Sequence, residues 1–232
     1  MIFPVYTGDI NKGLTGLDFL VQACEDLDPG AVWLPGFACA EAKDLLARLP
    51  AMTDCAPFRT MKTPGGHRMS VAMTNCGEWG WITDGKGYRY VSADPLTQRP
   101  WPALPGVFLR LAWEAAAAGG FPGFMPDSCL INRYVPGAKM SLHQDLDEAD
   151  LSAPIVSVSL GLPARFLWGG VTRQSPVRRL ELNHGDVLVW GGPSRLRFHG
   201  VLPVLSGTHP LTGPCRINLT FRQARRAMEL QS

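Results

Sequence analysis

In Arg216-Ile217-Asn218-Leu219-Thr220-Phe221-Arg222, polar and apolar residues alternate without a break. This period of two is typical of a β-strand and places Ile217, Leu219 and Phe221 on one face. If that face packs on a core, the other presents two guanidinium groups roughly 13 Å apart, an amide and a hydroxyl. An edge strand with a solvated polar face is the alternative, although such faces usually carry Lys, Glu or mixed charge. Two Arg on one face favour a bound anion.

Short apolar runs separated by turn formers continue upstream of this strand. The chain has 25 Gly and 20 Pro, which break it into segments too short for a helical bundle. We expect helices over Ala40–Leu49, with Pro50 beyond it, and over Leu104–Ala118, ended by Gly119. Expected strands cover Ala31–Leu34, Met69–Thr74, Cys129–Tyr134, Ile155–Leu160, Arg165–Trp168, Arg179–Leu182 and Val187–Trp190. The predicted fold is mainly β with flanking helices (α+β), of jelly-roll type.

Length and hydrophobicity indicate one domain. The chain has 232 residues, 46% of them hydrophobic, enough to bury one sizeable core. Residues 1–28 carry no clear strand signal and only a loosely helical stretch at Leu17–Leu27. We therefore predict an N-terminal extension over residues 1–28 and a single domain over residues 29–232.

Charge distribution and cysteine spacing bear on the kind of ligand and on the cellular compartment. The formal net charge is +2, but residues 1–60 hold 4 Lys and Arg against 8 Asp and Glu, so the remainder is basic. A basic body suits a polyanionic ligand, although ordinary scatter of surface charge explains it equally well. The six cysteines are scattered, with no pair at metal or redox spacing, and no apolar run is long enough to span a membrane. We expect reduced thiols, no membrane partner and a cytoplasmic location.

His143-Gln144-Asp145 places an imidazole and a carboxylate two residues apart, on one face of extended backbone. A third metal ligand must come from elsewhere, and His199, which follows the strand-like Arg195–Phe198, is preferred over the remaining candidates His67, His184 and His209. Two His and one carboxylate are typical of non-haem Fe(II) oxygenases, which keep open metal positions. A zinc hydrolase is the chemical competitor, and a lone His-x-Asp is usually a surface hydrogen bond.

The strand at residues 216–222 favours the Fe(II) oxygenase over these alternatives. Arg216 and Arg222 can each clamp one carboxylate through charge-assisted hydrogen bonds worth roughly 1.5–3 kcal/mol apiece. Upstream, Asn132 and Tyr134 share a face of another strand and can add an amide and a phenol. A metal with open positions beside a dicarboxylate site indicates 2-oxoglutarate as cosubstrate.

Motifs spread from about Pro29 to Ala224 resemble the AlkB family of DNA repair dioxygenases. They are Thr74-Asn75-Cys76-Gly77, Leu130-Ile131-Asn132-Arg133-Tyr134, Pro136-Gly137-Ala138-Lys139, His143-Gln144-Asp145, Ser157-Val158-Ser159-Leu160-Gly161, His184-Gly185-Asp186-Val187, Trp190-Gly191-Gly192 and Arg216 to Arg222. The resemblance implies a double-stranded β-helix over about residues 128–224, with a nucleotide-recognition lid over about residues 60–92.

The resemblance also implies roles for single residues. Fe(II) would be held by His143, Asp145 and His199, and O2 would react there. 2-Oxoglutarate would be held by Asn132, Tyr134, Arg216, Asn218 and Arg222. The damaged base would lie among Trp81, Tyr88, Met73, Thr63, Asp147 and Arg173. The implied activity is oxidative demethylation of 1-methyladenine and 3-methylcytosine, coupled to conversion of 2-oxoglutarate to succinate, with release of formaldehyde. The expected partner of this monomer is alkylated DNA, with RNA as a second substrate.

Each role has a plainer alternative. Trp81 could be an ordinary packing aromatic, although Gly77, Gly80 and Gly85 around it favour an exposed loop. Arg173 could be a surface charge, and we expect Glu148 and Asp150 to be a solvated acidic run. The whole protein could instead be a hydroxylase of a substrate other than nucleic acid, or a non-catalytic reader of alkylated bases. The complete His-Asp-His set disfavours the reader, and the Trp81 loop disfavours the small-molecule enzyme.

Overall fold

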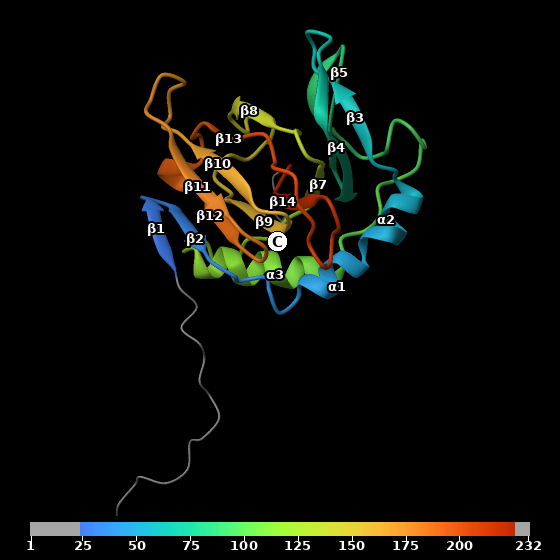
Figure 1. The fold of residues 1–232 in the computed structure, drawn as a ribbon. Helices are drawn as coiled ribbons and strands as arrows, with labels where there is room; N and C mark the ends of the chain where they lie inside the picture. The colour runs from blue at the N-terminus through green and yellow to red at the C-terminus, as the bar shows by residue number, and fades with distance from the viewer. Residues whose placement is uncertain (1–23, 226–232) are drawn as a thin grey trace, which may run out of the picture.

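The computed structural model describes residues 24–225, and its strands form two antiparallel sheets and a hairpin (Figure 1). The larger sheet has the order β1 (Glu25–Asp28), β2 (Ala31–Leu34), β12 (Val187–Trp190), β9 (Ile155–Gly161), β14 (Arg216–Arg222), β7 (Ser128–Tyr134), β4 (Arg68–Gly77), β3 (Arg59–Lys62). The smaller sheet has the order β11 (Arg178–Leu182), β10 (Ala164–Trp168), β13 (His199–Val201), β8 (Met140–His143). The hairpin pairs β5 (Gly80–Asp84) with β6 (Gly87–Val91). This mainly β arrangement confirms the predicted fold class.

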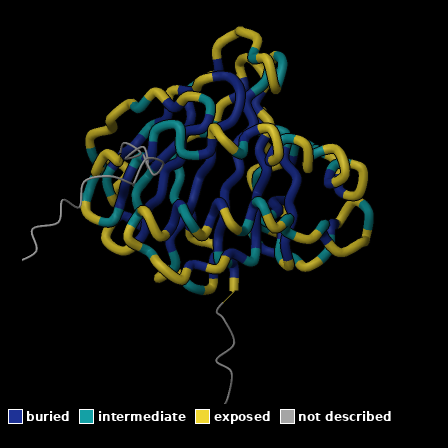
Figure 2. Tube along the Cα trace, turned by 90° about the horizontal axis from the view of Figure 1, so that it is seen from below, coloured by how far each residue is buried: buried dark blue, intermediate teal, exposed yellow. Residues whose placement is uncertain are grey.

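Two apolar layers hold these elements together. The helices are α1 (Ala42–Ala47), α2 (Leu49–Cys55) and α3 (Gly106–Ala118), with a 3-10 turn at Gly192–Ser194. One layer packs α3 and α1 under the larger sheet, and the other joins the larger sheet to the smaller one. Buried strands cross the middle of the molecule, while exposed residues follow the loops (Figure 2).

β14 lies in the centre of the larger sheet, hydrogen-bonded to β7 on one side and β9 on the other. Its apolar face packs on α3, where Phe221 meets Phe108 edge to face at 5.9 Å. Each such buried side chain contributes roughly 1.5–3 kcal/mol to folding. Its polar face is buried as well. The edge-strand alternative is therefore wrong, and the two Arg are interior cations.

Four sequence expectations are corrected at the level of local structure. Glu25–Asp28 is a strand paired with β2, so the sheet begins inside the predicted extension and the expected helix does not continue over these residues. Residues 17–23 of that expected helix lie outside the described residues. Pro50 does not close the helical region, because it occupies the first turn of α2, where a missing N–H is tolerated. Arg195–Phe198 is turn-like, and the strand starts at His199.

The hairpin β5–β6 stands at the end of the molecule formed by β3 and β4 (Figure 1). Asn75 on β4 holds it there, because its side chain exchanges two 3.0 Å hydrogen bonds with the backbone of Trp81. The buried Asn75 amide thus helps to fix the hairpin to the larger sheet, as do the hydrogen bonds of Thr83 to Met61 and Lys62 on β3. Within residues 24–225 no helix is long and apolar enough to cross a membrane.

Candidate active site

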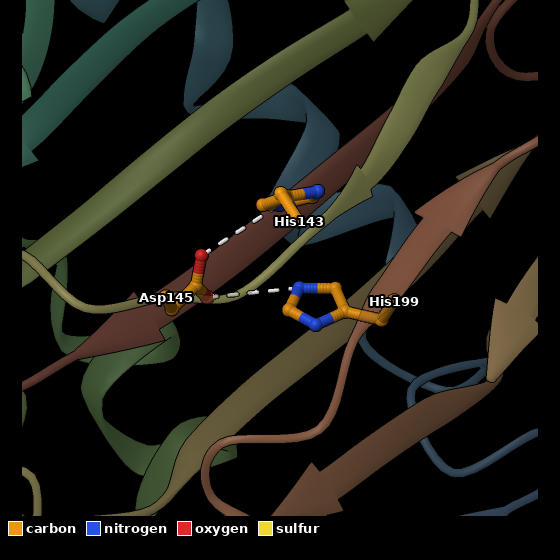
Figure 3. A group of neighbouring side chains, drawn as sticks. All are labelled: His143, Asp145 and His199. Carbon is orange, nitrogen blue, oxygen red and sulfur yellow. Dashed lines mark ion pairs between the residues drawn. The ribbon is translucent and has the colours of Figure 1, made fainter. Parts of the chain in front are cut away.

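His143 and His199 are brought together by strand pairing. They are directly opposite each other in the antiparallel pair β8–β13, and Asp145 follows two residues after His143. The Nε2 atom of His143 lies 3.7 Å from Asp145 Oδ1, and that of His199 lies 3.8 Å from Oδ2 (Figure 3). One ligand atom from each residue lies within 4.8 Å of the others, and no other His, Cys, Asp or Glu group in the described chain meets this criterion. Of the candidate histidines, His199 is thus the one that lies beside His143 and Asp145, as predicted.

The far nitrogens of both imidazoles are occupied by backbone carbonyls. His143 Nδ1 lies 2.8 Å from Ser141 O, and His199 Nδ1 lies 3.0 Å from Arg197 O. If each Nδ1 carries the proton and donates it, both Nε2 lone pairs face Asp145. Such outer hydrogen bonds orient histidine ligands at metal sites.

Electrostatics favour the metal-binding protonation states of His199 and Asp145. Burial lowers the pKa of His199 to about 4, helped by the neighbouring His143, so His199 is neutral at pH 7. Burial alone would raise the pKa of Asp145, but the positive charge of Arg222 and its hydrogen bonds to the carboxylate hold that pKa below its ordinary value. A neutral imidazole and an ionised carboxylate are the forms that ligate divalent cations.

The five predicted 2-oxoglutarate residues line one small cavity that also touches His143 and His199. They lie on the adjacent strands β7 and β14, where Asn132 is paired with Asn218 and Tyr134 with Arg216. These residues are Asn132, Tyr134, Arg216, Asn218 and Arg222, and all are buried.

Arg216 fits a carboxylate in this cavity. Its Nη2 donates to Ser159 Oγ at 2.9 Å, but its buried Nε and Nη1 have no hydrogen-bond partner among residues 24–225. Burial lowers the pKa of this guanidinium, and its centre lies 5.1 Å from the ring of Tyr134. A buried cation with unpaired donors is costly unless an anion binds it. The donor set therefore suits one carboxylate of a dicarboxylate.

Arg222 is placed differently. Its Nε and Nη2 donate to Asp145 Oδ2 at 3.0 and 2.7 Å, which ties it to the metal triad. It also lines both the small cavity and a larger neighbouring one. The two guanidiniums of β14 are thus not equivalent, because one is already paired within the protein.

The larger cavity, of about 710 Å³, is lined in part by His143 and Asp145 of the triad. This is the size range of small-molecule and nucleobase pockets. Trp81 and Tyr88 of the hairpin stack there with ring centroids 5.7 Å apart, and Trp81 Nε1 donates to Asp147 Oδ2 at 2.7 Å. Lining it are the predicted base-binding residues Thr63, Met73, Trp81, Tyr88, Asp147 and Arg173, together with His143, Asp145 and Arg222. A flat ligand between the hairpin and His143 would reach the metal site directly.

Sequence reasoning missed one part of the site. Glu148, expected in solvent, is buried against Arg195, Arg222 and Tyr90. The expectation failed because an acidic cluster looks solvated unless its partners are known, and those partners are distant in sequence. The one available signal was that buried Arg on β14 needs counter-charge. Asp150, half-buried, accepts hydrogen bonds from Ser152 in a local turn.

Comparisons with known proteins agree with this geometry. The family model of the 2OG-Fe(II) oxygenase superfamily matches residues 30–222. Alpha-ketoglutarate-dependent dioxygenase AlkB of Escherichia coli (strain K12) is 59% identical over 200 residues, which cover 86% of this chain and 93% of that protein. The tRNA demethylase abh1 of Schizosaccharomyces pombe is 30% identical over 160 residues, 62% of this chain and 52% of its own. The solved structure of OsALKBH1 is 33% identical, with a TM-score of 0.77, and covers 87% of this chain and 100% of its own.

Proposed function

Because the chain belongs to the AlkB family within the 2OG-Fe(II) oxygenase superfamily, we propose that it repairs N-alkylated nucleobases, with 1-methyladenine and 3-methylcytosine as its lesions. It is an Fe(II)- and 2-oxoglutarate-dependent dioxygenase. The observation that carries the proposal is one continuous site, in which His143 and Asp145 of the metal triad line the same cavity as Trp81 and Tyr88 of the hairpin. His143 and Arg222 line both this cavity and the one with the unpaired Arg216 donors.

His143, Asp145 and His199 would hold Fe(II), and Arg216 would hold the far carboxylate of 2-oxoglutarate with Asn132, Tyr134, Asn218 and Arg222 around it. When bound, iron with 2-oxoglutarate and O2 supplies the oxidation, in which one oxygen atom goes to succinate and the other to the N-methyl carbon. The hydroxymethyl group left on the base then breaks its C–N bond and departs as formaldehyde. The base is restored and CO2 is the remaining product.

The walls of the larger cavity select the lesion. Methylation of the pairing edge removes hydrogen bonds and lowers the few kcal/mol needed to flip a base out of a duplex. 1-Methyladenine and 3-methylcytosine are also cationic. Stacking on Trp81 then gains roughly 0.5–2 kcal/mol of cation–π attraction, and Asp147 adds a charge-assisted hydrogen bond. An undamaged base has neither advantage.

The remaining assignments complete the proposal. Residues 60–92 act as the lid, and Thr63, Met73, Tyr88 and Arg173 contact the flipped nucleotide. Alkylated DNA is the main partner, and RNA carrying the same lesions is a second substrate, a proposal supported by the similarity to abh1. The enzyme is proposed to act as a monomer. All six cysteines are free, which supports a reducing, cytoplasmic location.

The test is an assay of products on paired oligonucleotides. Protein with Fe(II), 2-oxoglutarate and ascorbate is given an oligonucleotide with one 3-methylcytosine, or the same sequence unmethylated. We expect formaldehyde from the methylated strand alone, one molecule for each additional succinate, and none from the Asp145→Ala variant. Equal succinate with both strands and no formaldehyde would reject a nucleic-acid substrate.

A further inference from the structure

Glu148 is a buried acid that no step of the proposed reaction uses. Its side chain is 2% exposed. Oε1 accepts a 2.6 Å hydrogen bond from the Tyr90 hydroxyl and lies 3.3 Å from Arg222 Nε, while Oε2 accepts a 2.9 Å hydrogen bond from Arg195 Nη2. A buried carboxylate with two hydrogen-bond donors and a second guanidinium at 3.3 Å is held in one position, because any rotation would leave charged groups unpaired in the interior.

Both Arg partners of Glu148 also contact the metal ligand Asp145. Arg222 donates to the Asp145 carboxylate, and Arg195 Nη1 donates to the Asp145 backbone carbonyl at 2.9 Å. Glu148 therefore supports Asp145 in two ways. Arg222 holds the Asp145 side chain, and Arg195 holds the Asp145 main chain. The four charges, two acids and two guanidiniums, also balance within the cluster.

The third partner comes from the hairpin. Tyr90 on β6 is the direct cross-strand partner of Trp81 on β5. Tyr90 is buried, and burial raises its pKa well above the ordinary value, so the phenol remains a donor. A continuous path of contacts thus runs from the hairpin, through Tyr90 and Glu148, to Arg222 and Asp145.

We propose that Glu148 is a positioning residue, which fixes the metal ligand Asp145 through Arg222 and Arg195 and links its position to the β5–β6 hairpin through Tyr90. The inference rests on the proposed function only in taking Asp145 as a metal ligand. Its test needs no nucleic acid, so its failure and that of the repair activity are separate results.

The first measurement is Co(II) affinity, in a titration monitored through the absorption bands of the bound ion. Glu148→Gln keeps the shape of the side chain but removes its charge, which leaves one guanidinium uncompensated. We expect the Co(II) dissociation constant to rise about tenfold or more, as is usual when an outer hydrogen bond of a metal site is lost. Glu114→Gln, on the exposed face of α3, is the matched control and should match wild type. A value for Glu148→Gln within twofold of wild type, measured below the melting temperature of both variants, overturns the positioning role.

The second measurement is amide hydrogen exchange in the hairpin, and it uses Tyr90→Phe, which removes one hydroxyl and leaves the charged cluster in place. In wild type, loading with Co(II) and 2-oxoglutarate should slow exchange over residues 80–91. In Tyr90→Phe that slowing should be lost, while β9 and β14 stay protected. Equal slowing in both proteins, or none in wild type, overturns the link to the hairpin. If Glu148→Gln does not fold, Tyr90→Phe still provides a test of the proposal.

Discussion

Trp81 and Asp147 are joined by one hydrogen bond, in which the indole Nε1 donates to Asp147 Oδ2 at 2.7 Å. The bond joins β5 of the hairpin to the segment that follows Asp145, and both of its residues line the larger cavity. It orients the indole plane and the carboxylate together, and Tyr88 stacks on the same ring at 5.7 Å. Within residues 24–225 Asp147 has no other hydrogen bond, so its second oxygen can accept one from a base. The aromatic and acidic walls of the pocket are therefore set before a ligand arrives.

Replacement of Trp81 separates base stacking from structural support. Trp81→Ala should lose roughly 1–3 kcal/mol of stacking, which lowers formaldehyde release by about ten- to a hundredfold. Trp81→Phe should lose less, since it keeps a ring. The melting temperature should change little because Trp81 is only partly buried. Succinate formation in the absence of oligonucleotide, with ascorbate as reductant, should persist. Trp101→Ala is the contrasting control, since the loss of this buried side chain should cost roughly 3–5 kcal/mol of stability. A parallel collapse of melting temperature and both activities in Trp81→Ala would make Trp81 structural.

Arg216→Lys tests the cosubstrate cavity. The substitution keeps the charge but removes the planar fork whose Nε and Nη1 are unpaired. We expect the dissociation constant for 2-oxoglutarate to rise about tenfold or more, since a charge-assisted hydrogen bond is worth roughly 1.5–3 kcal/mol. Oligonucleotide affinity should stay at the wild-type value. Exposed Arg179→Lys is the control. Unchanged 2-oxoglutarate binding with weakened oligonucleotide binding would assign Arg216 to the nucleic acid instead.

The metal-free protein should lose stability as the pH falls from about 6.5 to about 4. The pKa of His199 is lowered to about 4 in the fold, chiefly by burial, whereas in the unfolded chain it is near 6.5. Over this window the unfolded chain binds a proton that the folded protein does not. The stabilisation is therefore complete above pH 6.5 and declines toward pH 4, by roughly 3 kcal/mol in all. Melting temperatures measured across this pH range in the presence of a chelator check this prediction. The melting temperature of His199→Asn should fall less steeply with pH than that of wild type, and that of the control His67→Asn should fall as steeply as wild type. Identical profiles for His199→Asn and wild type would refute it.

Gly161→Ala should be far more costly than Gly137→Ala, although both residues have positive φ. At Gly161, with φ +89°, an added Cβ would lie 2.2 Å from Thr212 Oγ1 and 2.6 Å from the Cys215 carbonyl oxygen. At Gly137, with φ +85°, a Cβ would meet nothing within 4 Å. The control should lose only the left-handed penalty of roughly 1–2 kcal/mol. Since Gly161 pairs with Arg216, its replacement should also weaken 2-oxoglutarate binding. Equal melting temperatures for the two variants would contradict this.

The sequence alone determined the features that depend on local periodicity and on motif chemistry. Alternation in residues 216–222 predicted the strand with those bounds, and His-x-Asp predicted two ligands on one side of the chain. His199 was chosen among the remaining histidines for its place after a strand-like segment. The roles of the five cavity residues on β7 and β14 and of the six pocket residues came from the resemblance to the AlkB family, with side-chain chemistry pointing to a carboxylate at Arg216 and Arg222.

Only the tertiary structure decided which charges are partners. Glu148, Arg195, Arg222 and Tyr90 come from four separate segments, so no local pattern relates them, and burial turns what reads as a solvated acidic run into a closed network. The different surroundings of Arg216 and Arg222 have the same origin. Both occupy the polar face of one strand, but Asp145 lies beside one and an open cavity beside the other, because side-chain partners are set by sheet register and loop placement.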